Sequence, residues 1–348
     1  MGPLSTIYNL ALKCRRYCYD HLRKPNRLPA KVISIGNITL GGTGKTPAVI
    51  ALAREASKRG LNPCVLTRGY KGKSKDTCFI SKGDGPLLNA EQAGDEAFLM
   101  AETLRGVPIV KGSDRFRAGI MALEYDQLAI INLPQSRLFL LDDGFQHWRL
   151  HRDIDVLLID ATNPFGNGRL FPEGTMREPF SALERADIIL ITKSDVATDG
   201  AVLDITDEIR KYSNAPVFRA FHKTVAVISN SGETEGTETL DTKKVYAFSG
   251  IANPAYFQAS LRSIGAEIIG SRKFRDHHLY TQKEIDEIRK NAGNHMIITT
   301  EKDLVKLRDL NIPENISALK IEFSVDKDFY DHIFNMLEGG FHDQDHKS

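Results

Sequence analysis

The sequence is poor in features that would assign it to several common classes of protein. It contains only four cysteines and one tryptophan in 348 residues. Four cysteines without a C-x-x-C pair make neither a disulfide framework nor a zinc ribbon, so a reducing compartment fits best. The 46 Lys and Arg residues balance the 45 Asp and Glu residues, so no bulk charge favours nucleic acid as a partner. Nothing in the sequence indicates an obligate protein partner.

Long apolar stretches are missing as well. No run approaches the roughly 20 apolar residues of a membrane span. The first residues also lack the basic start, apolar stretch and cleavage site of a signal peptide, so we expect the protein to stay where it is made. At 348 residues the chain is long enough for a full hydrophobic core, and for two lobes rather than one.

The first segment, from about Pro3 to Leu22, has the period of an amphipathic helix with basic flanks. Apolar residues recur at spacings of three and four, namely Leu4, Ile7, Tyr8, Ala11, Cys14, Cys18 and Leu22. Such a stripe can enter the acyl boundary of a leaflet while its basic neighbours bind anionic headgroups. Taken alone, however, the pattern favours a helix docked on the protein's own core.

From Lys31 onward, short apolar runs alternate with helical patterns, which predicts a parallel sheet covered by helices on both faces. A polar, turn-rich stretch then precedes a second, smaller α/β lobe. We predict an N-terminal helix, a main α/β domain, a connecting hairpin or linker, a C-terminal lobe and a disordered tail, at residues 1–28, 29–215, 216–242, 243–337 and 338–348.

The strongest local signal is a glycine-rich turn, VISIGNITLGGTGKTPAVIAL, between an apolar strand and an amphipathic helix. Backbone N–H groups of such a turn surround phosphate oxygens, and the helix N-terminus adds partial positive charge. Lys45 would reach the β- and γ-phosphates of ATP, and the Thr46 hydroxyl would ligate Mg²⁺. Thr39 stands where the usual pattern has its first glycine. The predicted nucleotide site consists of Gly41, Gly42, Thr43, Gly44, Lys45 and Thr46.

A second apolar run, RLFLLDDGFQH, ends in paired acids where a Walker B carboxylate is expected. Asp142 or Asp143 should therefore hold the Mg²⁺ shell. The sequence Asp-Asp-Gly also favours a β-turn, which is the alternative interpretation. In a chain that carries a phosphate loop, the metal-binding interpretation is the better one.

Two rival functions follow from other features. The run IILITKSD resembles the base-reading loop of GTPases, which would make the protein a P-loop GTPase or a metal-insertion chaperone. The similar run IITTEKD recurs at 297–303, so both turns could simply be solvated strand ends. The other rival is a non-enzymatic membrane-binding module with a degenerate nucleotide fold.

Transfer to an alcohol needs a group that accepts or positions its proton. Asp95 and Glu96 stand at a probable helix start, where an acid can equally be an N-cap. His277 and His278 follow Asp276 in the second lobe, and only one of two adjacent side chains faces a given site. An Asp–His pair formed across a cleft between the lobes could tune the base.

Basic candidates for the phosphates are spread along the main domain. Arg68, Arg115 and Arg177 each stand in a turn-rich motif, LTRGYKGK, GSDRFRAG and GTMREP. Each could clamp a phosphate or pair with a nearby acid, and the spacing leaves both open.

Nine sequence blocks, in order from about Ile33 to Leu307, resemble the tetraacyldisaccharide 4'-kinase family of lipid A biosynthesis. They are GNITLGGTGKTP, LTRGYKGK, GDEAFLM, LLDDGFQHWRLHRDIDVLLID, NPFGNGRLFPEGTMREP, ITKSD, FSGIANPAYF, DHHLYT and TTEKDLVKL. Together they are far more specific than the phosphate loop alone. The resemblance implies a P-loop NTPase-like fold and ATP- and Mg²⁺-dependent phosphorylation of the 4'-hydroxyl of tetraacyldisaccharide 1-phosphate to lipid IVA.

The resemblance also implies a cellular location and a set of active-site residues. The family works at the cytoplasmic face of the bacterial inner membrane, which favours an anionic membrane surface as the partner of the N-terminal helix. Its catalytic Asp–His pair falls on Asp95 and, in the DHH run, on His277, with His278 still open. Its residues near the phosphates or the Mg²⁺ cluster correspond to Arg68, Arg115, Arg177 and Glu178.

Overall fold

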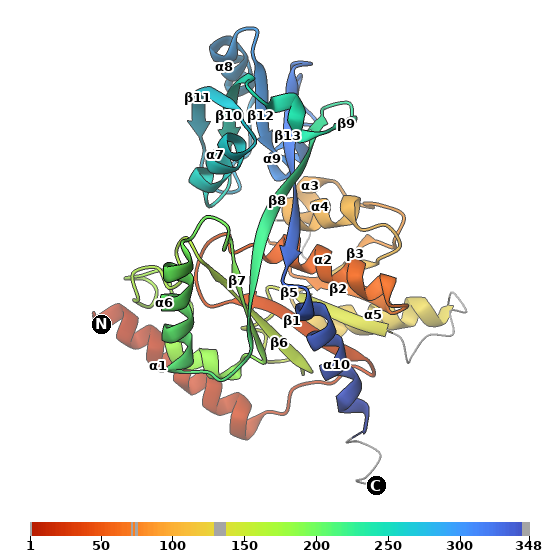
Figure 1. Cartoon of the computed structure of the whole chain (residues 1–348). Coiled ribbons are helices and arrows are strands. Elements are labelled where there is room, and N and C mark those ends of the chain that lie inside the picture. The colour runs from red at the N-terminus through yellow and green to blue at the C-terminus, as the bar shows by residue number, and fades with distance from the viewer. Residues whose placement is uncertain (1, 71, 74–75, 129–136, 343–348) are drawn as a thin grey trace.

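The protein is described by a computed structural model that covers residues 2–70, 72–73, 76–128 and 137–342. A larger lobe and a smaller lobe are joined by two long strands that run between them (Figure 1). Helix α1 (Pro3–Tyr17), which continues as a π-helical turn (Cys18–Leu22), lies along the outside of the larger lobe. No helix in the described ranges is both long and apolar enough to cross a membrane.

The larger lobe contains the predicted parallel sheet. Its strands are β1 (Lys31–Asn37), β2 (Asn62–Thr67), β3 (Cys78–Ser81), β4 (Ile109–Lys111), β5 (Arg137–Asp142), β6 (Ile154–Asp160) and β7 (Ile188–Thr192). They lie in the order β7-β6-β1-β5-β2-β4-β3, and only the β3–β4 pair is antiparallel. The central strands read as continuous apolar runs because both of their faces are buried.

Helices cover both faces of this sheet. They are α2 (Lys45–Lys58), α3 (Ala90–Ala93), α4 (Asp95–Thr103), α5 (Arg115–Leu128), α6 (Asp199–Arg210) and a 3-10 turn (Phe180–Arg185). Neighbouring residues of β1 show the two faces, since Ile33 lies in one core cluster with α2 and Val32 in another with α5. The covering predicted from the sequence is therefore present.

The smaller lobe is a second α/β unit. Its parallel strands are β10 (Lys244–Ser249), β11 (Glu267–Lys273) and β12 (Met296–Thr300). Its helices are α7 (Pro254–Ser263), α8 (Gln282–Ala292) and α9 (Glu301–Val305), preceded by a 3-10 turn (Thr237–Leu240). The lobe has core clusters of its own, one beneath α7 and one beneath α8.

The two lobes share one continuous sheet through β8 (Val217–Ser229) and β13 (Ile316–Val325). The first residues of β8 pair in parallel with β7, and the rest pair antiparallel with β13. A short strand, β9 (Thr234–Glu235), folds back on the end of β8. The segment expected to be a linker or hairpin thus contains a long strand that passes from one lobe to the other (Figure 1).

The last helix, α10 (Asp328–His342), differs from the sequence prediction. Residues up to 337 were assigned to the C-terminal lobe and the tail was expected to start at 338, yet α10 returns to the larger lobe and continues through His342. Phe329, Ile333, Phe334 and Leu337 form a helical stripe that joins the core beneath β1 and α2. The predicted tail residues 343–348 lie outside the described part of the chain, and the division into domains stays a prediction.

Candidate active site

The phosphate loop lies between β1 and α2, as the sequence predicts. Gly41 and Gly44 have φ angles of +122° and +83°, which side chains rarely tolerate. The end of β7 holds the loop, because the Thr192 hydroxyl donates to the carbonyl oxygen of Thr43 at 3.0 Å and Lys193 Nζ donates to that of Gly42 at 2.9 Å. These bonds fix the orientation of the peptides that would bind phosphate.

The TKSD run therefore has structural partners in this fold. Besides the loop carbonyl, Lys193 binds the carboxylate of Asp160 at the end of β6. Asp195 accepts a hydrogen bond from the Tyr256 hydroxyl of the smaller lobe at 3.3 Å. The similar run in the second lobe is not merely a solvated strand end either, since Asp303 is fully buried and accepts the N–H of Gly250 at 2.8 Å.

The two acids at the end of β5 have different environments. Asp142 accepts a hydrogen bond from the Thr67 hydroxyl at 2.8 Å. Burial, together with the charges of Glu96 and Asp143, raises the pKa of Asp142 to about 6. Burial also acts on Asp143, but the cations Lys45, at 3.5 Å, and Arg177, with two contacts at 2.9 and 3.0 Å, outweigh it and lower its pKa.

Asp95 and His277 meet across the two lobes. His277 Nδ1 lies 3.0 Å from both carboxylate oxygens of Asp95, although the residues are 182 positions apart in the chain. The N-cap of α4 is Gly94, so Asp95 is the first helical residue rather than the cap. His278 points elsewhere, because it binds Glu284 at 3.1 Å and stacks on Phe274. The geometry thus pairs His277, and not its neighbour, with Asp95.

Asp95 is nearly buried among cations. Besides His277, Lys306 Nζ lies 3.4 Å and Lys302 Nζ 3.9 Å from its carboxylate. Burial alone would raise the pKa of Asp95, but the His277 hydrogen bond and the positive charges of Lys302, His277 and Lys306 outweigh it and hold the pKa well below its usual range. Asp95 is therefore ionised at neutral pH.

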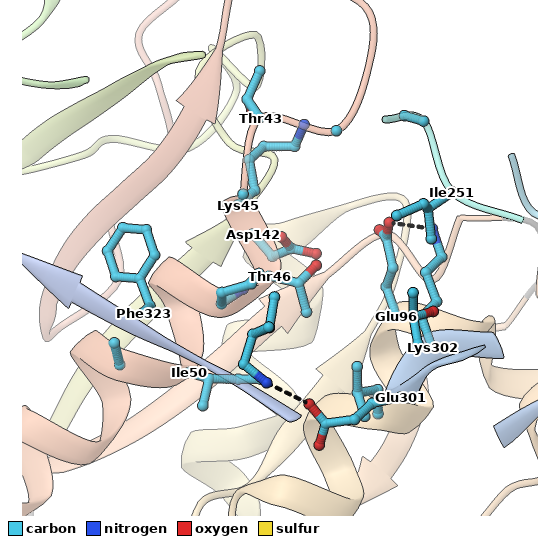
Figure 2. Close-up of a pocket in the computed structure, with 18 of the residues that line it drawn as sticks. Thr43, Lys45, Thr46, Ile50, Glu96, Asp142, Ile251, Glu301, Lys302 and Phe323 are labelled. Atoms are coloured by element: carbon cyan, nitrogen blue, oxygen red, sulfur yellow. Dashed lines mark hydrogen bonds and ion pairs between the residues drawn. The ribbon is translucent and has the colours of Figure 1, made fainter. Parts of the chain in front are cut away.

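A cavity of about 910 Å³ lies between the lobes and is lined by residues of both, among them His277 but not Asp95. The phosphate loop, Asp142 and Asp143 line one part of it, and His277, Glu96 and Lys302 line another. In Figure 2, Lys45, Thr46 and Asp142 lie on one side, with Glu96 and Lys302 across from them. The lobes touch at the loop itself, since a Cβ on Gly42 would lie 3.2 Å from that of Ala252.

The structure separates the basic candidates into two groups. Arg68 and Arg177 line the cavity. Arg115 is buried outside its lining and donates to the carbonyl oxygen of Ser113 at 3.2 Å, and burial lowers its pKa. Glu178 also lies outside the lining, where it forms a buried, two-contact ion pair with Arg185 at 2.8 and 2.9 Å.

The sequence did not single out Lys302 as a site residue. It lies in the TTEKD block, at the start of α9, and its amine contacts Glu96 at 3.1 Å, Asp276 at 3.3 Å and His277 Nε2 at 3.4 Å. The lysine faces a site only because α9 packs against α4 of the other lobe. No periodicity in the sequence reports such a contact.

The loop 170–177 separates α1 from the phosphate loop. On one side, the Ser5 hydroxyl donates to the carbonyl oxygen of Leu170 at 2.9 Å, and the Tyr8 hydroxyl donates to that of Arg177 at 2.9 Å. On the other side, the Arg177 N–H donates to the Ile38 carbonyl at 2.7 Å, at the entry to the phosphate loop. Helix α1, the loop 170–177 and the phosphate loop therefore lie in three successive layers, each in contact with the next.

The residues present fit a divalent cation. Burial and the neighbouring charges of Glu96 and Asp143 raise the pKa of Asp142, and a bound cation would offset these effects. No group of three or more His, Cys, Asp or Glu side chains in the described ranges is arranged to hold a metal ion alone. Mg²⁺ in nucleotide sites is typically held by one or two carboxylates and by phosphate oxygens, which is the set that this cavity offers.

A phosphate loop that lines an interlobe cavity, with an ionised, histidine-bound carboxylate beside it, is the arrangement expected of a P-loop kinase. A family model described as tetraacyldisaccharide-1-P 4'-kinase (LpxK) matches residues 1–338. The chain belongs to the tetraacyldisaccharide 4'-kinase family.

Individual relatives agree with this membership. Proteins named tetraacyldisaccharide 4'-kinase from Halothermothrix orenii and Syntrophus aciditrophicus are 38% and 37% identical to the chain, over 93% and 97% of its length and 88% and 92% of theirs. A crystal structure of LpxK from Aquifex aeolicus in complex with ATP matches with a TM-score of 0.76 and 31% identity, over 96% of this chain and 97% of that one. The predicted family, P-loop fold and kinase activity are confirmed.

Proposed function

We propose that the protein transfers the γ-phosphate of ATP directly to the 4'-hydroxyl of tetraacyldisaccharide 1-phosphate, which gives lipid IVA, and that Asp95, oriented by His277, accepts or positions the hydroxyl proton. The observation that carries this proposal is the Asp95–His277 pair, held at 3.0 Å between the lobes beside the cavity that contains the phosphate loop. The O–P bond to the sugar forms as the bond to ADP breaks, so no phosphoenzyme is required.

The residues of the phosphate loop hold the nucleotide in this proposal. Gly41, Gly42, Thr43 and Gly44 offer backbone N–H groups, and Lys45 offsets the charge that spreads over the transferring oxygens. Arg68 and Arg177 line the same cavity and add positive charge near the phosphates. In this proposal Arg115 and Glu178 act indirectly, from the layer of side chains next to the cavity.

Mg²⁺ is part of the proposal, with Thr46, Asp142 and Asp143 as the protein groups that hold it. When bound, the ion neutralises charge on the phosphate oxygens and brings them into line. Asp143 contributes in a second way, because its carboxylate already ties Lys45 to Arg177 and so orients both cations.

The direct test uses purified protein, Mg-ATP and detergent-dispersed tetraacyldisaccharide 1-phosphate, with the lipid analysed by mass spectrometry. Wild type should add one phosphoryl group to the lipid, and Lys45→Ala and Asp95→Ala should not do so at a comparable rate. A GTP competition series distinguishes the GTPase alternative, which requires a preference for guanine and no lipid product. An unmodified lipid despite bound ATP would refute the acceptor.

We also propose that the protein works at the cytoplasmic face of the inner membrane and binds its anionic surface through α1. The apolar residues on the outer face of this helix are strongly exposed: the exposed fraction is 63% for Leu4, 65% for Ile7 and 61% for Leu10. Arg15 and Arg16 stand in its last turn, where headgroup phosphates would meet them. No obligate protein partner is part of the proposal.

Vesicle flotation tests this membrane contact. Replacing Leu4, Ile7 and Leu10 together by Gln removes the apolar stripe without touching Ser5 or Tyr8, which anchor the helix to the lobe. The variant should float with anionic vesicles much less than wild type. Leu203→Gln is the matched control, because Leu203 is 58% exposed on a different helix. Equal flotation of the triple variant and wild type would exclude α1 as the membrane contact.

A further inference from the structure

Lys302 lies at the centre of the charged groups that surround His277. Its side chain is 15% exposed and contacts Glu96, Asp276 and His277, which come from both lobes. Burial would lower the pKa of Lys302, but the charges of Glu96, Asp95 and Asp276 outweigh it and raise the pKa to about 12. The amine is therefore a permanent cation.

The contact between Lys302 and His277 involves one ring nitrogen. An ammonium group has only donors, so in a hydrogen bond between Lys302 Nζ and Nε2, which lie 3.4 Å apart, Nε2 is the acceptor. A neutral imidazole with an accepting Nε2 carries its proton on Nδ1. Nδ1 lies 3.0 Å from both oxygens of Asp95, so that proton is donated to the carboxylate.

Charges of both signs surround His277. Asp95 lies at Nδ1, and the carboxylates of Asp276 and Glu96 lie 3.7 and 3.9 Å from Nε2. A carboxylate stabilises positive charge on a neighbouring imidazole, and an ammonium group opposes it. The nearby cations that oppose them are Lys302 and, on the far side of Asp95, Lys306. The uncharged ring of Tyr70 packs edge-on against His277.

We propose that Lys302 is a positioning residue that holds His277 as the neutral Nδ1–H tautomer, with that N–H donated to Asp95. This inference rests on the proposed role of the Asp95–His277 pair, because its effect on turnover arises through that pair. A neutral donor leaves Asp95 a stronger base than an imidazolium would. The proposed carboxylate chemistry therefore depends on a lysine that contacts neither the phosphate loop nor, in this role, the substrate.

The test reads the tautomer directly, by ¹⁵N NMR of the full chain labelled at histidine, with His277→Gln identifying the signal. Wild type at neutral pH should show a protonated Nδ1 and a bare Nε2. Lys302→Met should give an imidazolium at the same pH, because the opposing cation is gone. The acidic limb of its kcat against pH should move upward as well. Lys302→Arg, which restores the cation, should return both readouts toward wild type.

A matched control separates charge at His277 from lobe contact in general. Arg308 also joins the lobes, through Glu102 at 2.9 Å, but does not contact His277. Arg308→Met should leave the tautomer and the pH profile unchanged. An unshifted titration in Lys302→Met, or an Nε2–H tautomer in wild type, would overturn the inference. If the proposed function were wrong, the Asp95→Asn variant would show wild-type turnover. That outcome is distinguishable from failure of the tautomer inference, because the NMR titration needs no lipid.

Discussion

Replacing Asp95 by Asn tests the site most sharply, because the two side chains have nearly the same shape and differ in charge. The amide keeps a hydrogen bond to His277 but can no longer accept the hydroxyl proton. General base catalysis contributes about 10²–10⁴-fold to turnover, so we expect kcat to fall by that factor. The KM for ATP should change little, since the nucleotide residues are untouched.

The same substitution has a predictable effect on stability. Lys306 is 4% exposed, and in the variant Asp303, at 3.0 Å, would remain as its acidic partner among the residues that the structure describes. Leaving a buried group partly unsatisfied costs about 1–3 kcal/mol. The free energy of unfolding at pH 7 should therefore fall by roughly that amount, measured by urea denaturation.

The pH dependence of this loss has a definite sign. The pKa of Asp95 is lower in the folded protein than in the unfolded chain, where it is near 4 (about 3.9). Its stabilisation is therefore fully present above the unfolded pKa and is lost as the pH falls through the folded pKa. The difference in unfolding free energy between wild type and Asp95→Asn should shrink as the buffer becomes more acidic than the unfolded pKa of about 3.9.

A surface control makes the result interpretable. Asp199 has an 87% exposed side chain beside Arg219, so Asp199→Asn should change neither kcat nor the pH dependence of stability. If the difference between wild type and Asp95→Asn stays the same down to the lowest pH at which both proteins fold, Asp95 is not stabilised in its ionised form. Undiminished turnover would show that it is not the proton acceptor.

Three further substitutions test separate parts of the structure. His278→Gln should retain near-wild-type kcat, whereas His277→Gln should lose most of it; a greater loss in His278→Gln would show that the wrong histidine is paired with the reaction. Thr192→Val removes the hydroxyl that holds the Thr43 carbonyl, and calorimetry should show several-fold weaker ATP binding, with unchanged affinity as the contrary result. Phe334→Ala should destabilise the larger lobe by about 3–5 kcal/mol in urea, since Phe334 is buried beside α2; a change below about 1 kcal/mol would place α10 outside that core.

The sequence predicted those parts of the site that are local in the chain. The strand, glycine turn and helix around Lys45 are contiguous, and the two acids of β5 directly follow an apolar run. Each such unit carries its own physical signature, because backbone conformation, burial and helix capping depend on neighbouring residues. The resemblance to the family supplied the pairing of Asp95 with a histidine of the DHH run, and the structure selected His277.

Contacts between distant segments were beyond the sequence. The role of Lys302 depends on α9 meeting α4, and the packing of α10 depends on β13 carrying the chain back to the larger lobe. The apolar stripe of α10 can be recognised in the sequence, but periodicity alone does not predict which hydrophobic core the helix packs against. Arg115 and Glu178 correspond by motif to residues near the phosphates or the Mg²⁺ cluster, and the motif does not report that each is buried outside the cavity lining.

The layering of α1, the loop 170–177 and the phosphate loop has a consequence for engineering the protein. One hydrogen bond, from Tyr8 to the Arg177 carbonyl, and one ion pair, from Arg177 to Asp143, connect the outermost helix to the acid beside Lys45. An unrelated lipid anchor fused in place of α1 would supply the proposed membrane attachment but not this connection. We therefore expect that exchanging the helix alters turnover even when all of the enzyme is bound to the membrane.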